Sequence, residues 1–183
     1  TASYNTAVGN DTLYGTTTGA YNTAVGDQAL GANTTGGSNV SVGYGSLVAN
    51  TTGSNNIAIG RGALDANTGA SNLMAIGRGA LGSWTATSGN SAIAIGNYVG
   101  GNTVSGGDWT AVGYNALGAN TTGSANSVFG TGGMDNNTTG SKNVAVGNYA
   151  LSANTTGSQN VAVGFEALKA HTTSADCVAV GYQ

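Results

Sequence analysis

The chain has 183 residues, of which 33 are glycine and none is proline, and only 6% are charged. A formal charge of −3, with four lysines and arginines in all, argues against nucleic acid as a partner. The sequence shows no signal peptide, transmembrane run or basic cluster. We therefore expect a single domain over residues 1–183 and no membrane insertion of this segment.

A seventeen-residue unit recurs along the chain and is clearest in residues 142–158, KNVAVGNYALSANTTGS. Each copy contains a V/I-A-V/I-G step, whose last residue we call the anchor glycine. Nine of the ten intervals between anchors are seventeen residues, and the interval from Gly77 to Gly96 is nineteen, which places a two-residue insertion between Leu81 and Ala92. A fixed period of this kind is typical of a solenoid. The anchors are Gly9, Gly26, Gly43, Gly60, Gly77, Gly96, Gly113, Gly130, Gly147, Gly164 and Gly181.

Each column of the repeat predicts an environment. The residue before the anchor is always Val, Ile or Phe, which predicts a buried position, and the residue two before it is Ala in nine of eleven copies. Since alternate residues of a strand point to opposite faces, the β-branched residues line one face and the alanines the other, and we expect both faces to be covered. Leucine recurs four residues after the anchor as a second apolar row. The N-T-T-G-S stretch is turn chemistry, in which Asn and Gly can accept a positive φ.

A helical repeat needs a longer unit, since helix-repeat periods are about 33 to 47 residues. Short parallel strands stacked one above the next satisfy the backbone of each copy through its neighbours. We therefore predict an all-β fold, a parallel β-solenoid with about seventeen residues per coil and roughly eleven coils. Asparagine recurs four residues before the anchor and again in the A-N-T-T stretch, so we expect its side-chain amides to bond to one another along the stack.

The repeat also predicts self-association. A coil of seventeen residues encloses a narrow lumen that suits the alanine row and could take the leucine row, which leaves Val, Ile and Leu positions in excess of what one thin coil can bury. A continuous apolar stripe along a rod exceeds what monomers usually expose. Both ends of the chain read as ordinary repeat text, not as capping units, so we expect a fragment of a longer fibre or ends that stack on something outside this chain.

The step N-V-A-V-G, at residues 143–147 and 160–164, resembles the head repeat of trimeric autotransporter adhesins. The longer unit AVGxxALxANTTGSxN resembles repeats of bacteriophage tail-fibre proteins and related bacterial surface proteins, and the resemblance covers the whole chain. It implies a left-handed parallel β-roll, three chains packed side by side as a homotrimer, and an extracellular place on a virion or cell surface.

Three aromatic residues are candidates for ligand contact: Trp84, Tyr98 and Trp109 lie in the least regular zone of the repeat. A lateral loop carrying them could stack on sugar rings. The competing interpretation is that Trp fills a hole left by Gly100, which stands where leucine is expected, and large aromatics more often fill space than bind ligand.

Two further patterns predict binding surfaces. Arg61 and Arg78 share one column in successive copies, beside Tyr44 and Tyr114, and form either an anion or carbohydrate patch or a solvated edge. A threonine row resembles an ice-binding face, although one outward row falls short of a flat lattice match. The row comprises Thr17, Thr34, Thr51, Thr68, Thr85, Thr121, Thr138, Thr155 and Thr172.

Residues of catalytic or metal-binding type are scattered. His171 stands alone in an asparagine column, Cys177 is the one cysteine, and the seven carboxylates form no paired arrangement. We therefore predict no enzyme, no cofactor and no metal. The function that the sequence favours is a structural and adhesive fibre segment, a rigid rod with possible contact to a surface glycan or receptor. The alternative is a ligand-binding solenoid, either lectin-like or ice-binding through the threonine ladder.

Overall fold

Each copy of the repeat forms one short strand, because its β-branched residues alternate with alanine just before a glycine that ends the strand. The computed structural model describes residues 1–87 and 91–183, and no helix occurs among them. The strands are β1 (Thr6–Val8), β2 (Thr23–Val25), β3 (Val40–Val42), β4 (Ile57–Ile59), β5 (Leu73–Ile76), β6 (Ala92–Ile95), β7 (Trp109–Val112), β8 (Ser127–Phe129), β9 (Val144–Val146), β10 (Val161–Val163) and β11 (Val178–Val180).

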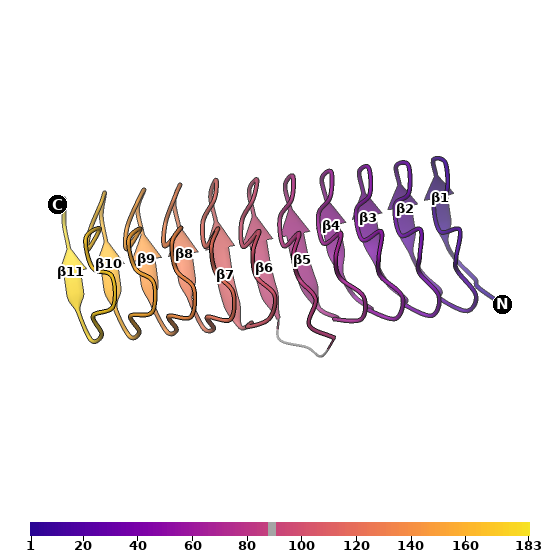
Figure 1. The fold of residues 1–183 in the computed structure, drawn as a ribbon. Helices are drawn as coiled ribbons and strands as arrows, with labels where there is room; N and C mark the ends of the chain where they lie inside the picture. Colours follow the sequence, from indigo (N-terminus) through magenta and orange to yellow (C-terminus); the bar gives the residue numbers. More distant parts are fainter. Residues whose placement is uncertain (88–90) are drawn as a thin grey trace.

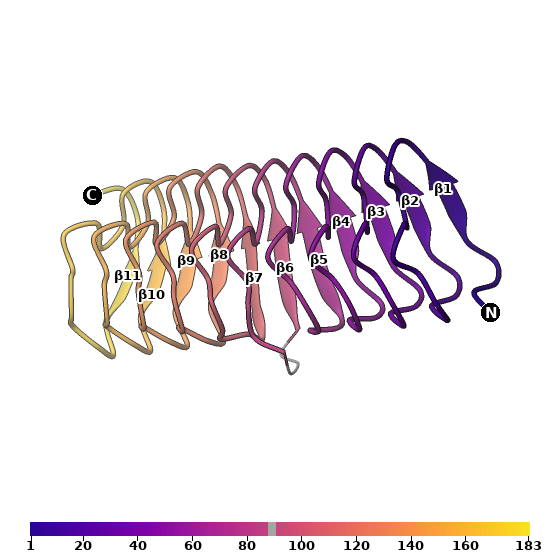
Figure 2. The ribbon, with the colours of Figure 1, turned by 45° about the vertical axis from the view of Figure 1, so that its right-hand side comes forward.

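The eleven strands form one parallel sheet in sequence order, from β1 to β11 (Figure 1). Each residue pairs with the residue one repeat later, as in Thr6 with Thr23. Successive turns lie side by side along a rod whose two ends carry the two termini (Figure 2). The predicted parallel β-solenoid of about seventeen residues per coil is confirmed. We number the coils 1 to 11 by their anchor glycines.

The two-residue insertion does not disturb the register on either side of it. Ala86 N donates to Val104 O at 3.0 Å, and Met74 pairs with Ile93, nineteen residues later. The extra residues therefore lie between Ala86 and Ala92, a stretch that includes residues 88–90, which are outside the described residues.

Hydrogen bonds between coils continue outside the strands. In the turns, Leu30 N donates to Ser46 O at 3.1 Å and Thr34 N donates to Thr51 O at 2.9 Å. These bonds repeat along the rod, so each coil satisfies much of the backbone of the one before it. The absence of proline follows from this, because most backbone N–H groups must donate to a neighbouring coil.

The interior is filled by the alanine row, as the narrow lumen predicts, and also by the leucine row, so leucine is not in excess. Alanines two before the anchor, such as Ala58, and leucines four after it, such as Leu64, are fully buried. Burying one leucine side chain contributes about 2 kcal/mol. The alanine and leucine rows belong to one hydrophobic core that runs along the rod.

The residue before the anchor is not buried, and that prediction is wrong. Val25, Phe129 and Val146 are 36%, 45% and 37% exposed. The side chain that alternates with the inward alanine must point out of the coil, and in a single chain nothing covers the outer side of the sheet. The prediction that both faces are covered therefore fails for the single chain.

The left-handed residues are not those of the N-T-T-G-S turn. Positive φ occurs at the buried leucine, for example 53° at Leu64, at the residue five before the anchor, for example 60° at Lys142, and at the residue two after the anchor, for example 58° at Tyr149. A left-handed residue other than glycine costs about 1–2 kcal/mol. The coil accepts this cost because these residues aim backbone donors at a neighbouring coil, as when Leu117 N donates to Gly133 O at 3.0 Å.

The asparagines of both rows are buried and form ladders, which confirms the sequence prediction. In the A-N-T-T row, Nδ2 of each asparagine donates to Oδ1 of the one in the preceding coil: Asn50 to Asn33 at 3.0 Å and Asn67 to Asn50 at 2.9 Å. In the row before the strand, Oδ1 accepts the backbone N–H of the next coil, as in Asn39 N to Asn22 Oδ1 at 3.0 Å. Buried amides are stable here because donors and acceptors meet in every coil.

Candidate functional site

Two surfaces of the rod differ from the rest. The first is the outer side of the sheet, which we call the outer face; it consists of the residues one and three before each anchor. These are Thr6, Val8, Thr23, Val25, Val40, Val42, Ile57, Ile59, Met74, Ile76, Ile93, Ile95, Thr110, Val112, Ser127, Phe129, Val144, Val146, Val161, Val163, Val178 and Val180.

The outer face is apolar along the whole rod and carries no charged residue. Its apolar character is interrupted only by threonine or serine three before the anchor in coils 1, 2, 7 and 8. With strands about 4.8 Å apart and about 3.3 Å per residue, it measures roughly 48 Å by 10 Å, on the order of 500 Å². This is at the upper end of the apolar patches that monomers expose, and such patches commonly mark an interaction surface.

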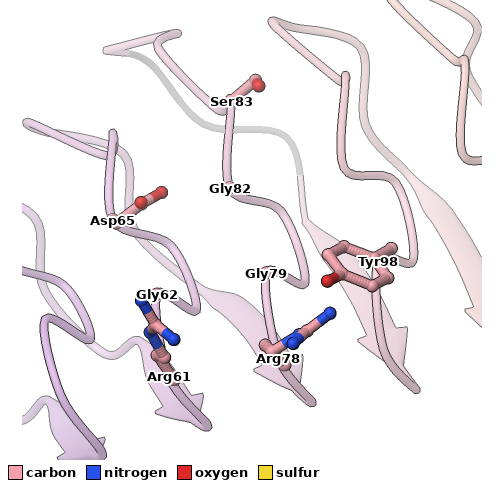
Figure 3. A pocket seen from close by; sticks show the side chains of 8 residues that line it. All are labelled: Arg61, Gly62, Asp65, Arg78, Gly79, Gly82, Ser83 and Tyr98. Carbon is pink, nitrogen blue, oxygen red and sulfur yellow. The ribbon is translucent and has the colours of Figure 1, made fainter.

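The second surface is a hollow beside the C-terminal ends of β4, β5 and β6, which we call the arginine groove (Figure 3). Its volume is about 500 Å³. A smaller hollow of about 300 Å³ continues it toward coil 2 and shares Arg61, Gly62 and Asp65 with it. The arginine groove is lined by Arg61, Gly62, Asp65, Arg78, Gly79, Gly82, Ser83 and Tyr98.

The groove exists because glycine occupies the second position after the anchor in coils 3, 4 and 5. Gly45, Gly62 and Gly79 have φ between 62° and 63° and carry no side chain, so the surface is hollow there. Coil 6 has Tyr98 in this column, and its ring lies over Gly79, with a ring carbon 3.1 Å from where a Cβ would stand. Tyr98 thereby closes one end of the groove.

The two arginines form one wall of the groove together with Tyr98. The guanidinium carbon of Arg78 lies 4.7 Å from the centre of the Tyr98 ring, and that of Arg61 lies 5.8 Å from the Tyr44 ring. Each ring attracts the cation through its π face and restricts where the guanidinium points. Figure 3 shows Asp65 and Ser83 on the other side of the glycine floor.

Within residues 1–87 and 91–183, no carboxylate forms an ion pair with either guanidinium. The one ion pair formed by residues 1–87 and 91–183 joins Lys169 and Glu166 at 2.7 Å. In the same part of the chain, the side chains of Arg61 and Arg78 donate no hydrogen bond, and Arg78 donates only through its backbone N–H. The groove therefore presents two adjacent positive charges whose donors are free to bind.

Asp65 brings a carboxyl group to the same groove. Partial burial raises its pKa above the ordinary value of 3.8, against smaller lowering effects of hydrogen bonds from the backbone of Ala66 and of Asp65 itself. Its carboxyl oxygens lie 3.5 Å and 3.3 Å from where Cβ atoms would stand on Gly62 and Gly82. The groove thus combines donors on one wall with an acceptor on the other.

The structure separates the three aromatic residues that the sequence singled out. Trp84 and Trp109 are 0% and 2% exposed and belong to the core, so they offer no ring to a sugar at the surface. Trp109 fills the space left by Gly100, since its ring lies 2.7 Å from where a Cβ of Gly100 would stand. Tyr98 alone lines a groove. The expectation of one exposed aromatic loop is therefore corrected to two core residues and one groove residue.

Among the described residues, six of the nine threonines in the row use their hydroxyl groups in hydrogen bonds to the next coil. Oγ1 of Thr34 donates to Thr51 O at 2.9 Å, and Thr51, Thr121, Thr138 and Thr155 make the corresponding bond to the next coil. Hydroxyls bonded along the rod axis are not free to match an ice lattice. Exposed threonines occur in the row itself at Thr17, Thr85 and Thr172, and also one residue later in the repeat, as at Thr52 and Thr139.

The scattered titratable residues do not converge. In the described ranges 1–87 and 91–183, no three residues of the His, Cys, Asp and Glu types lie close enough to hold a metal ion. His171 is half-buried in the asparagine column, and Cys177 N donates to Asn160 Oδ1 at 3.0 Å. In the part of the chain that the structure describes, no helix is long and apolar enough to cross a membrane.

Sequence reasoning found Arg61, Arg78 and Tyr44 but missed three features of the groove. Tyr98, in the next column, contacts Arg78, whereas Tyr114 instead packs edge-on against Tyr98 at 6.2 Å. The glycine floor and Asp65 were also missed. A signal was present, because three successive coils share glycine in a column that elsewhere carries glycine only once, at Gly132, and otherwise Asp, Gln, Tyr, Asn or Glu.

Comparison with models of known protein families, with curated proteins and with solved structures finds no match to this chain.

Proposed function

We propose that this chain is a structural and adhesive segment of an extracellular fibre, on a cell surface or a virion, that acts as a rigid rod and associates with copies of itself as a homotrimer. The observation that carries the proposal is the outer face, an uncharged apolar surface that follows the sheet from β1 to β11. Contact with a surface glycan or receptor would then occur along the sides of the rod.

A second copy of the chain is the occupant that best fits the outer face. Its side chains repeat at every strand, about 4.8 Å apart, and an identical rod has the same period. Because the face carries no charge, identical copies do not repel one another across it. Three copies, each covering part of two neighbours, agree with the resemblance to trimeric adhesin heads and tail-fibre repeats.

Sedimentation equilibrium tests this proposal. We expect the unmodified chain to sediment as a trimer with a β-type circular dichroism spectrum. In the variant Val25→Lys with Val146→Lys, two charges on the outer face should give a monomer with the same spectrum, since burying an unpaired charge is costly. The matched control, Thr35→Lys with Thr156→Lys, adds the same charges to exposed positions of the same coils and should stay trimeric.

Two results would contradict the proposal. One is a monomeric unmodified chain at micromolar concentrations, and the other is equal dissociation in both lysine variants, which would point to overall charge and not to the outer face.

A further inference from the structure

The arginine groove has a chemistry that nothing else on the rod repeats. Arg61 and Arg78 are two of only four lysines and arginines in the chain, and they stand in adjacent coils. The other two cations, Lys142 and Lys169, lie in coils 8 and 10. Positive charge is therefore concentrated at one place on a chain whose net charge is −3.

The geometry points to a carboxylate-bearing saccharide as the ligand of this groove, and we propose that the groove binds one. A guanidinium donates two parallel hydrogen bonds to a carboxylate, which makes arginine a strong and directional partner for it. Contacts with Tyr98 and Tyr44 restrict both guanidinium groups before binding, which lowers the entropy lost when a ligand binds.

The rest of the groove favours a sugar over a bare anion. Its volume of about 500 Å³ exceeds what an inorganic ion fills and suits one or two sugar rings. At Gly62, where only the Asp65 carboxyl group comes within 4 Å of the Cβ position, the glycine floor lets a flat ring approach the backbone. On the opposite wall, Asp65 and Ser83 offer acceptors for sugar hydroxyls, while the Asp65 carboxylate keeps the ligand's own negative charge toward the arginines (Figure 3).

The same features argue against a nucleic acid. Its affinity depends on neutralising many phosphates, whereas this groove holds two arginines and a carboxyl group on a chain of net negative charge. The groove is built within one chain, so this inference does not depend on the proposed trimer.

Isothermal titration calorimetry with 3′-sialyllactose, up to about 10 mM, tests the inference. Neutral lactose and inorganic phosphate are titrated in parallel. We expect sialyllactose to bind at least about tenfold more tightly than either, since a hydrogen-bonded charge pair and the sugar contacts are both needed. No detectable binding of sialyllactose overturns the inference, as does lactose binding equally well. Phosphate binding equally well overturns the saccharide assignment.

Variants locate the site. Arg61→Ala with Arg78→Ala should weaken sialyllactose binding about tenfold or more, while Lys142→Ala with Lys169→Ala, which removes the same charge elsewhere, should leave it unchanged. Equal weakening in both would mean a diffuse charge effect and overturns the assignment. Gly82→Tyr fills the groove without removing charge; Tyr14 occupies the same column of coil 1, so the fold accepts this residue. It should also abolish binding, with an unchanged melting temperature.

The monomeric variant Val25→Lys with Val146→Lys separates this inference from the proposed function. It should still bind sialyllactose, because both substitutions lie outside the groove. Loss of binding in the monomer would overturn the single-chain site, even if the trimer itself is confirmed.

Discussion

Coils 8 and 9 and coils 5 and 6 solve the same packing problem in different ways. In coils 8 and 9 the two inner polar columns hold asparagines, as at Asn137 and Asn143, and nearly every amide bonds to the adjacent coil. In coils 5 and 6 the A-N-T-T column holds Trp84 and Thr103, and the column four before the anchor holds Leu73 and Ala92. Gly100 stands in the leucine row of coil 6.

The difference shows that the rod requires filled volume in every coil, whereas the polar ladder is optional. The strands keep their register through the irregular coils, with Ala92 paired to Trp109. The asparagine ladder can therefore stop where apolar side chains fill its column. A smaller core side chain in one coil must then be matched by a larger one in the neighbouring coil. Trp109 over Gly100 is such a match.

Replacing Gly100 or Trp109 by the residue found at that position in regular coils should have the largest effect on the free energy of unfolding. Gly100→Leu alone overpacks the core, because a Cβ there would lie 2.7 Å from the Trp109 ring, and Trp109→Asn alone leaves a cavity. Each should lower the free energy of unfolding by about 3 kcal/mol or more. Leucine suits the backbone at this position, since φ is 56° at Gly100 and 52° at Leu117.

The double variant Gly100→Leu with Trp109→Asn restores the pair found in regular coils. It should recover about 2 kcal/mol relative to the sum of the single changes, as measured by urea denaturation at one protein concentration. Simple additivity of the two losses would show that the pair is not coupled.

Breaking the ladder inside a regular coil should have the next largest effect. Asn137 donates to Asn120 Oδ1 at 2.9 Å and to Gly140 O at 3.0 Å, and accepts from Asn154 Nδ2 at 2.9 Å. Asn137→Ala should lower the free energy of unfolding by about 2–3 kcal/mol, because it leaves buried groups unpaired. The exposed neighbour Thr139→Ala serves as the control and should change it by less than about 0.5 kcal/mol. Equal effects would mean that the ladder contributes nothing specific.

Extending the ladder should stabilise the rod by a smaller amount. It ends at Asn154, whose buried Oδ1 has no partner, and the next coil carries His171, whose Nδ1 is also buried without a partner. His171→Asn supplies the missing amide and should raise the free energy of unfolding by about 1 kcal/mol. A fall in the thermal midpoint, measured by circular dichroism, would argue against this end of the ladder.

The two half-buried aspartates should show the smallest effect. Burial raises the pKa of both Asp65 and Asp135, which share one column, above 3.8. A raised pKa in the folded state means that stability falls as pH rises from 3.8 through the folded value. Asp65→Asn and Asp135→Asn should each remove that fall and gain well under about 1 kcal/mol at neutral pH, because solvent screens half-exposed charges.

The matched aspartates also sharpen the contrast between the groove and the regular coils. The two variants should change the pH dependence of denaturation alike, yet only Asp65→Asn should change sialyllactose binding, because Asp135 lies outside the groove. The same change in binding for both would remove Asp65 from the groove's recognition of its ligand.

Parts of the candidate site could be predicted from the sequence and parts could not. The period places Arg61 and Arg78 in successive coils, because it puts like positions one above another, and the structure confirms this through the pairing of β4 with β5. Nearness in an irregular stretch instead groups Tyr98 with Trp84 and Trp109 and wrongly predicts a shared surface. Column position decides the surface: Trp84 and Trp109 stand in the inward asparagine columns, and Tyr98 stands in the outward column of the glycines.

The period, the parallel stacking and the asparagine ladders could all be predicted from the pattern of residues, because a residue that recurs every seventeen positions meets its own kind in each adjacent coil. Strand alternation also places alanine and valine on opposite sides, and the narrow lumen suits the alanines. The sequence pattern did not reveal that the valines stay uncovered in a single chain, because their apolar character alone predicts burial. The curvature of the turns, set by left-handed residues such as Leu64, closes the coil over the alanines and leaves the valines outside.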